Sequence, residues 1–158
     1  MKKSIVFLFV FLFLIFPLTE TFAGSDNQAY QVKDSYIEFF ADGSYAVIEI
    51  IYPDCPDGTT GTTSGQKKYT YYNDNNVKQW VICLDGTFTY TGSSATCNSA
   101  STSYSISNNS WSVTKAQASR SGATATGEFT VKKYSLGIVV QTVNKTLTLT
   151  CSPTGVLS

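Results

Sequence analysis

Histidine is absent from this chain of 158 residues, and charged residues make up only 14% of it. Without an imidazole, a Ser-His-Asp triad, a Cys-His pair and any histidine-based metal site are impossible. Eleven basic residues balance eleven acidic ones, and beyond the N-terminus the only basic runs are the lysine pairs at 67–68 and 132–133. Because a basic footprint for nucleic acid is missing, we expect no nucleic-acid partner, and also no metal and no cofactor.

A pair of carboxylates is the one catalytic arrangement that the composition leaves open. Glu38 and Glu49 lie on strands that we expect to be neighbours, with both side chains on one face. A solvated sheet face explains them more simply. We therefore expect a protein that is not an enzyme and has no catalytic residue.

Long apolar runs are also missing, except at the N-terminus. Lys2 and Lys3 precede twelve unbroken apolar residues, Ile5 to Phe16, and the stretch ends in a small-x-small cleavage site at Ala23. This run is shorter than the roughly 20 residues that span a bilayer. We therefore predict a signal peptide over 1–23, cleaved after Ala23, and a secreted, extracellular product without a membrane span. A flexible leader over 24–34 and a single domain over 35–158 are expected to follow.

The residues that are abundant are typical of β-strands. Tyrosine, threonine, valine and isoleucine suit a pleated, half-buried surface, and stretches with helical periodicity are missing. Asp42-Gly43 between two alternating segments predicts a hairpin with a two-residue type I′ turn. This pairing places Ile37 opposite Ile48 and Phe39 opposite Ala46 on the core face.

A long strand from Val77 to Tyr90 is the preferred interpretation of the next apolar segment, and a two-residue turn at Asp85-Gly86 is the alternative. The long strand puts five large side chains on one face: Trp80, Ile82, Leu84, Phe88 and Tyr90. About eight or nine strands joined mainly by hairpins follow from the whole pattern. The sequence therefore predicts an all-β fold, an antiparallel β-sandwich of immunoglobulin-like or jelly-roll-like type.

The four cysteines are Cys55, Cys83, Cys97 and Cys151. An even number in an exported chain favours two disulfides. A zinc site is the alternative, but no pair has the C-x-x-C spacing and histidine is absent. The predicted strand faces favour Cys97 with Cys151 as a staple in the core, and Cys55 with Cys83 as a tie on the surface loop.

Aromatic residues are the strongest indication of a binding surface. Tyr69 and Tyr71 lie on one predicted hairpin, and Trp111 follows a polar turn. Exposed rings beside Asn and Thr groups can stack on sugar faces, whereas packing in the core is the alternative for each ring. We take Tyr69, Tyr71 and Trp111 as candidate binding residues.

Three segments of the C-terminal half carry a resemblance: Gly86 to Cys97 (GTFTYTGSSATC), Leu136 to Thr142 (LGIVVQT) and Leu147 to Ser158 (LTLTCSPTGVLS). Together they resemble small secreted bacterial β-rich proteins. The resemblance implies a secreted β-rich domain and transfers no active-site residue.

These observations predict a secreted, non-enzymatic β-sandwich that binds a cell-surface glycan or protein. The alternative is a small secreted inhibitor or toxin-like effector, in which the turn-rich loop from Pro53 to Gln66 presents a recognition segment.

Overall fold

The computed structural model describes residues 30–53 and 60–158. This part of the chain forms strands and no helix, in this order: β1 (Gln31–Phe39), β2 (Tyr45–Tyr52), β3 (Gly61–Tyr72), β4 (Lys78–Tyr90), β5 (Ala95–Ile106), β6 (Trp111–Ser121), β7 (Thr124–Ser135) and β8 (Ile138–Thr150). The predicted signal peptide, residues 24–29 of the predicted leader, and Cys55 lie outside the described residues. β1 begins at Gln31, so the last residues of the predicted leader belong to a strand.

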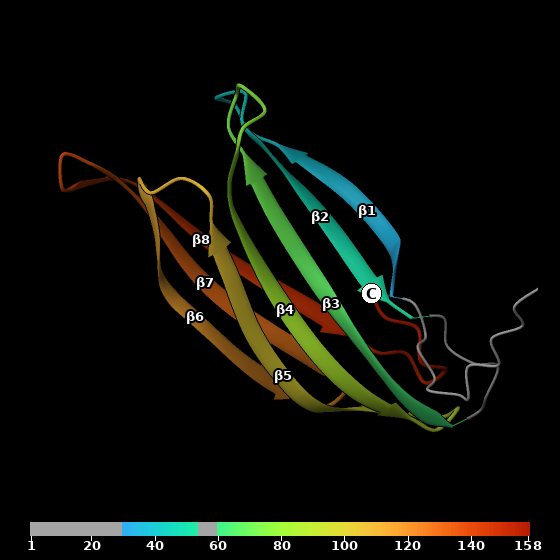
Figure 1. Cartoon of the computed structure of the whole chain (residues 1–158). Helices are drawn as coiled ribbons and strands as arrows, with labels where there is room; N and C mark the ends of the chain where they lie inside the picture. The colour runs from blue at the N-terminus through green and yellow to red at the C-terminus, as the bar shows by residue number, and fades with distance from the viewer. Residues whose placement is uncertain (1–29, 54–59) are drawn as a thin grey trace, which may run out of the picture.

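The strands form two antiparallel sheets that lie face to face (Figure 1). One sheet has the order β1-β2-β3-β4-β5 and the other β6-β7-β8, so within each sheet every strand pairs with the next strand along the chain. The prediction of an all-β antiparallel sandwich is confirmed. Its connectivity is a meander, simpler than the Greek-key connections of immunoglobulin and jelly-roll folds.

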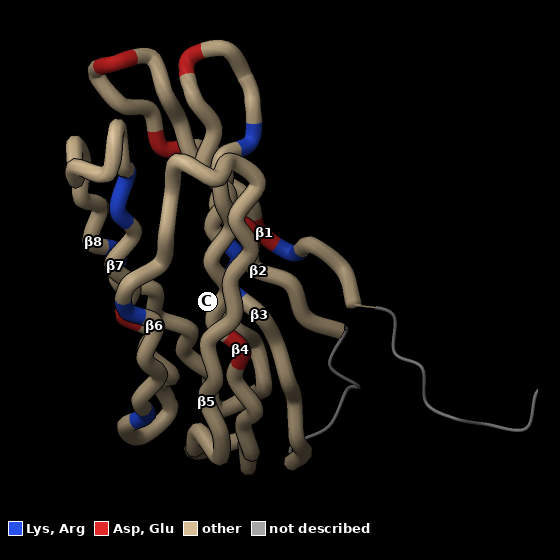
Figure 2. The backbone as a smooth tube through the Cα atoms, turned by 60° about the vertical axis from the view of Figure 1, so that its left-hand side comes forward, with Lys and Arg blue, Asp and Glu red and all other residues tan. Residues whose placement is uncertain are grey.

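The core lies between the two sheets, which Figure 2 shows from another side. β4 supplies the largest part, because its five predicted core residues are all buried: Trp80, Ile82, Leu84, Phe88 and Tyr90. β4 is one long strand, which excludes a turn at Asp85-Gly86. Gly86 allows the close packing, since a Cβ there would lie 2.7 Å from a ring carbon of Phe88.

The two sheets are joined along one side and open along the other. β5 and β6 are consecutive strands that run side by side where the chain passes between the sheets (Figure 1). On the far side, β8 lies over β3 and β4, and β1 and β2 extend past it. There Lys145 of β8 forms an ion pair with Glu38 of β1.

The register of the first hairpin differs from the prediction. The N–H of Phe40 donates to the carbonyl of Ser44, and the N–H of Gly43 donates to that of Phe40. The loop thus has three central residues, with Gly43 at a φ of +83°, a geometry typical of a type I turn with a bulge. Ile37 therefore pairs with Val47 and Phe39 with Tyr45. This one-residue slip moves Ile37 and Phe39 to the outer face.

The predicted disulfides are not formed among the described residues. Cys83 and Cys97 are free thiols, so neither the Cys97–Cys151 bond nor a bond from Cys83 is present. The Sγ of Cys97 donates to the carbonyl of Ser99 at 3.3 Å, and that of Cys151 donates to the carbonyl of Ser152 at 3.3 Å. Each thiol is turned toward the backbone of its own segment.

The described residues include no helix with the length and apolar character needed to cross a membrane.

Candidate functional site

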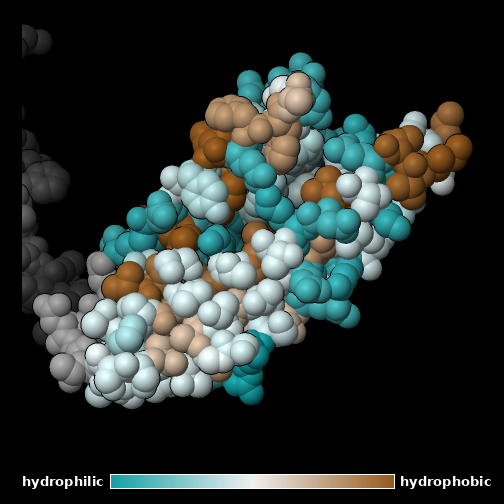
Figure 3. All heavy atoms as spheres, turned by 180° about the vertical axis from the view of Figure 1, so that it is seen from behind, coloured by the Kyte–Doolittle hydropathy of each residue, from teal (hydrophilic) through white to brown (hydrophobic). Residues whose placement is uncertain are grey.

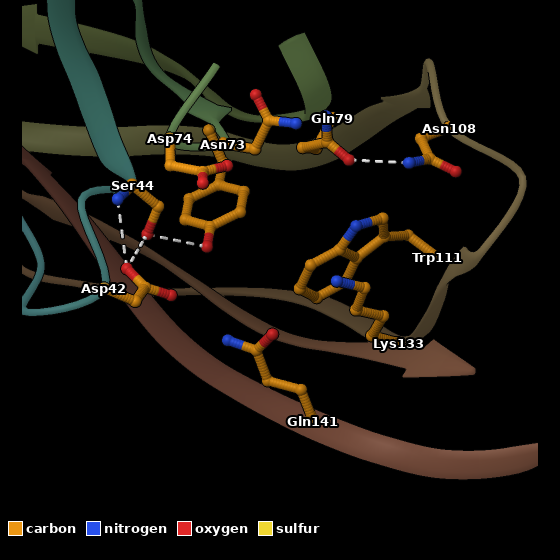
Figure 4. Close-up of a pocket in the computed structure, with 10 residues that line it drawn as sticks. Asp42, Ser44, Asn73, Asp74, Gln79, Asn108, Trp111, Lys133 and Gln141 are labelled. Atoms are coloured by element: carbon orange, nitrogen blue, oxygen red, sulfur yellow. Dashed lines mark hydrogen bonds between the residues drawn. The ribbon is translucent and has the colours of Figure 1, made fainter. Parts of the chain in front are cut away.

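Four turns lie at one end of the sandwich, because consecutive strands of a meander alternate in direction. These are the turns that join β1 to β2, β3 to β4, β5 to β6 and β7 to β8 (Figure 1). A groove opens between the sheets at this end, and we call it the mouth groove. Its first part encloses about 300 Å³ and is lined by Asp42, Ser44, Tyr71, Asn73, Asp74, Gln79, Asn108, Trp111, Lys133 and Gln141 (Figure 4).

A second hollow continues the mouth groove along β8. It encloses about 310 Å³ and shares Asp42, Ser44, Tyr71 and Gln141 with the first part. Phe40 and residues 142–144 of β8 complete its lining. The mouth groove is therefore elongated, running from Trp111 toward Asn144.

A chain of hydrogen bonds fixes the carboxylate of Asp42. The hydroxyl of Tyr71 donates to Ser44 Oγ at 2.9 Å. Ser44 then donates to Asp42 Oδ1 from its own hydroxyl and, at 3.0 Å, from its backbone N–H. The side-chain hydrogen bond from Ser44, followed by the backbone one, lowers the pKa of Asp42. Asp42 therefore presents an ionised carboxylate that can accept hydrogen bonds.

Side-chain amides form the opposite wall. Gln79 is buried, and its Nε2 donates to the carbonyl of Val77 at 2.8 Å. Its Oε1 accepts a 2.7 Å hydrogen bond from Asn108 Nδ2 (Figure 4). Gln141 of β8 lies across the mouth groove from them, as Figure 4 shows. These planar amides offer both donors and acceptors at fixed positions.

Trp111 forms the end wall of the mouth groove. The ammonium group of Lys133 lies over the ring of Trp111, 5.7 Å from the ring centroid. Its indole N–H is buried and has no hydrogen-bond partner among the described residues, and the nitrogen lies on the side of the ring that faces Gln79 (Figure 4). A buried donor without a partner is rare in folded proteins, and the indole N–H of Trp80 is a second one among the described residues.

An aromatic cluster supports the mouth groove from below. Tyr71 stacks on Trp80 with ring centroids 4.9 Å apart, and it meets Trp111 edge-on at 5.6 Å. Tyr69 also stacks on Trp80, with ring centroids 5.6 Å apart. Such packed rings hold the lining side chains in fixed rotamers.

The three aromatic residues predicted to bind are all buried. Tyr69, Tyr71 and Trp111 keep 0%, 6% and 4% of their surface exposed, so the expectation that they form an exposed stacking surface is wrong. Tyr71 and Trp111 still line the mouth groove, whereas Tyr69 does not. The Tyr69 hydroxyl instead donates to Glu38 at 3.2 Å, and burial followed by the charge of Glu38 raises the pKa of Tyr69.

A β-bulge explains why Trp111 faces the core. Trp111 pairs with Lys133 and Val113 with Val131, but the next pair is Lys115 with Thr130. The extra residue, Thr114, reverses the alternation of faces. Trp111 therefore lies on the face opposite to that of Lys115, although simple alternation places the two on the same face.

Among the aromatic residues that do reach the sheet surface are Phe39, Tyr45 and Tyr72. They lie side by side on the outer face of β1, β2 and β3. The rings of Tyr45 and Tyr72 stack on each other at 4.9 Å, with 8° between their planes. Rings that cover each other's faces offer mainly their edges to a ligand, which is a poor platform for a flat sugar ring.

The carboxylates considered as a catalytic pair do not come together. Glu38 pairs with Ala46 and Glu49 with Ser35, and this register places them on opposite faces of the sheet. Glu38 bonds to Lys145 and Tyr69 on the inner side, whereas Glu49 holds Lys68 at 2.8 Å on the outer side. The described residues thus offer no paired carboxylate of the kind expected.

No known protein family, curated protein or solved structure matches this chain. The binding properties of the mouth groove therefore follow from its own side chains. Five of the ten residues that line its first part lie in turns, and sequence reasoning assigned one of them, Asp42, only to turn formation. The sequence could have indicated the mouth groove only through the order of the strands, because in a meander every second turn lies at the same end of the sandwich.

Proposed function

We propose that this protein is a secreted, non-enzymatic binding protein that holds a glycan in the mouth groove. The observation that carries the proposal is one lining in which hydrogen-bonded amides and an ionised carboxylate lie beside a buried tryptophan. Glycans present hydroxyl groups in pairs together with apolar C–H faces. The lining offers hydrogen-bonding partners for the hydroxyl groups, and Phe40 and Val143 offer apolar surface for the C–H faces.

The hydrogen-bonding groups of the mouth groove match hydroxyl pairs. Asp42 accepts, and the amides of Asn108 and Gln141 both donate and accept. Asp42 and Gln79 are already held by hydrogen bonds within the protein. Binding therefore costs little side-chain ordering at these positions, which favours affinity.

The size and shape of the mouth groove support an oligosaccharide more than a protein segment. Its two parts enclose about 300 Å³ and 310 Å³, and they share a wall. This is the lower range of small-ligand pockets. A glycan of a few units fits an elongated groove of this size, with one unit against Trp111 and the next toward Asn144.

Two further features support a role in binding outside the cytoplasm. The predicted signal peptide favours export. The Asp42 carboxyl has a lowered pKa, so at neutral pH it is poorly suited to donate a proton as a general acid. We therefore assign it to recognition.

The direct test is a titration of the purified chain from Gly24 onward with oligosaccharides selected on a glycan array. The chain contains two tryptophans, and only Trp111 lines the mouth groove. Tryptophan fluorescence should therefore change on binding, and the sugar should be recovered unaltered. Cleavage of the sugar would contradict the non-enzymatic role.

A matched pair of glutamine variants locates the ligand. Gln141→Ala removes an amide from the mouth groove, whereas Gln117→Ala removes an exposed glutamine of β6 elsewhere. Loss of one or two hydrogen bonds should weaken binding about three- to tenfold in Gln141→Ala and leave Gln117→Ala unchanged. Equal effects of both variants, or the absence of any glycan ligand, would refute the proposal.

A further inference from the structure

The hairpin between β7 and β8 ends in an apolar tip that packs against nothing in the described part of the chain. Leu136 is 100% exposed, Ile138 69%, and Val140 56%. Figure 3 shows this tip as a hydrophobic projection from the body of the molecule. An exposed apolar group of this size is unusual for a soluble surface and marks a place of interaction.

The backbone conformation of the tip disfavours leucine, so the presence of leucine there needs an explanation. Leu136 and Gly137 have φ values of +50° and +79° and form the two central residues between Ser135 and Ile138. Turns of this kind favour Asn or Gly at the first position, and a leucine there is strained. The fold does not require leucine at this position. We therefore take the Leu136 side chain to serve an interaction with another molecule.

The apolar side chains surround the tip instead of forming one face. Ile138 and Val139 are successive strand residues, so their side chains point to opposite faces of the hairpin. Leu136 extends from the end. A docking site for a folded protein needs one apolar face, whereas a tip that is apolar all round fits a medium that encloses it, as lipid hydrocarbon does.

The residues behind the tip continue in the order found at a membrane interface. Tyr134 pairs with Val139, and Lys132 comes next but one along β7. Leu136 lies two residues from Tyr134, about 7 Å along a strand, which is within the depth of about 5–10 Å that interfacial segments reach. No acidic residue occurs from Phe129 to Ser158, so the charge of Lys132 complements the phosphates of anionic lipid.

We propose that the β7–β8 tip inserts into the surface of a lipid bilayer and holds the protein there. Leu136 and Ile138 enter the acyl boundary, Tyr134 lies at the level of the headgroups, and Lys132 faces their phosphates. Lys133 takes no part, because its ammonium lies over the ring of Trp111. The mouth groove opens at the same end of the sandwich, but the proposal does not rest on a ligand bound there.

The test is co-sedimentation of the chain from Gly24 onward with vesicles of phosphatidylcholine containing a minority of phosphatidylglycerol. This chain lacks the N-terminal apolar run, which would bind lipid by itself. The decisive variant is Leu136→Asn, since asparagine suits a positive φ and should leave the fold at least as stable. Loss of one buried leucine should lower the partition coefficient about tenfold.

Two further variants complete the test. Val156→Ser removes a half-exposed valine of the C-terminal tail and should bind vesicles like the unaltered chain. Lys132→Gln should weaken binding about fivefold on the anionic vesicles and not on pure phosphatidylcholine. Failure of the unaltered chain to sediment with vesicles, or equal binding by Leu136→Asn, would overturn the proposal. So would a dimer in sedimentation velocity that Leu136→Asn abolishes, because the tip would then belong to a second copy.

Discussion

Ser44 is the residue whose replacement tests the construction of the mouth groove most directly. Its hydroxyl donates to Asp42 and accepts from Tyr71, and Ser44 itself is buried. Ser44→Ala removes both interactions without adding atoms. Tyr71 then keeps a hydroxyl at the groove floor with no partner from Ser44. Asp42 loses the hydrogen bond that contributes most to its lowered pKa.

The expected loss of stability is about 1–2 kcal/mol. A buried hydroxyl left without its partner costs about 1–3 kcal/mol, and water that enters the open groove should recover part of this cost. Tyr71→Phe removes the orphaned hydroxyl. The double variant should therefore be less destabilised than the sum of the two single variants.

Urea unfolding of the two single variants and the double variant measures these terms, with exposed Ser119→Ala as the control. The pKa of Asp42, followed by NMR of its carboxyl carbon, should rise toward the ordinary value in Ser44→Ala. Strict additivity, or an unchanged Asp42 pKa, would refute the hydrogen-bond chain.

Three other predictions concern the core and the titrating groups. Gly86→Ala should destabilise the fold by about 1–3 kcal/mol in urea unfolding, because the added Cβ overlaps the Phe88 ring; a neutral effect would contradict the packing of β4. After reduction, Cys97 should react with iodoacetamide far more slowly in the folded than in the unfolded chain, because it is buried and burial raises its pKa. Burial and Glu38 raise the pKa of Tyr69 above its ordinary value of 10.0, so the stabilising contribution of its neutral form is complete below that pH. This contribution should be lost as the pH rises toward the folded value. The urea midpoint should fall across this alkaline range, and it should fall less steeply in Tyr69→Phe.

The β4 strand shows what could be predicted from the sequence. Large apolar residues occupy every second position over a long segment except at Gly86, and all of those predicted for the core are buried. In β1 and β2 the alternation is equally clear, but the hairpin turn decides which face is buried. Asp-Gly suits several turn geometries, and the three-residue loop shifted the register by one residue.

Bulges account for a second difference between the predicted and the observed structure, the face on which Trp111 lies. A bulge at Thr114 reverses the alternation within β6, and a register shift between Lys133 and Tyr134 has a similar effect where β7 pairs with β8. Composition alone gives little sign of such insertions, because any residue can occupy many of these positions. The mouth groove was missed for a related reason, since it depends on which turns meet and not on any one segment.

The neighbour-by-neighbour pairing of the strands has a consequence for how the chain folds. Each backbone ladder closes a short loop, so little chain entropy is lost before each ladder can form. All-β proteins with distant pairings fold slowly for the opposite reason. We therefore expect this sandwich to acquire its structure faster than a Greek-key protein of equal length, with hairpins able to form one after another from either end of the polypeptide.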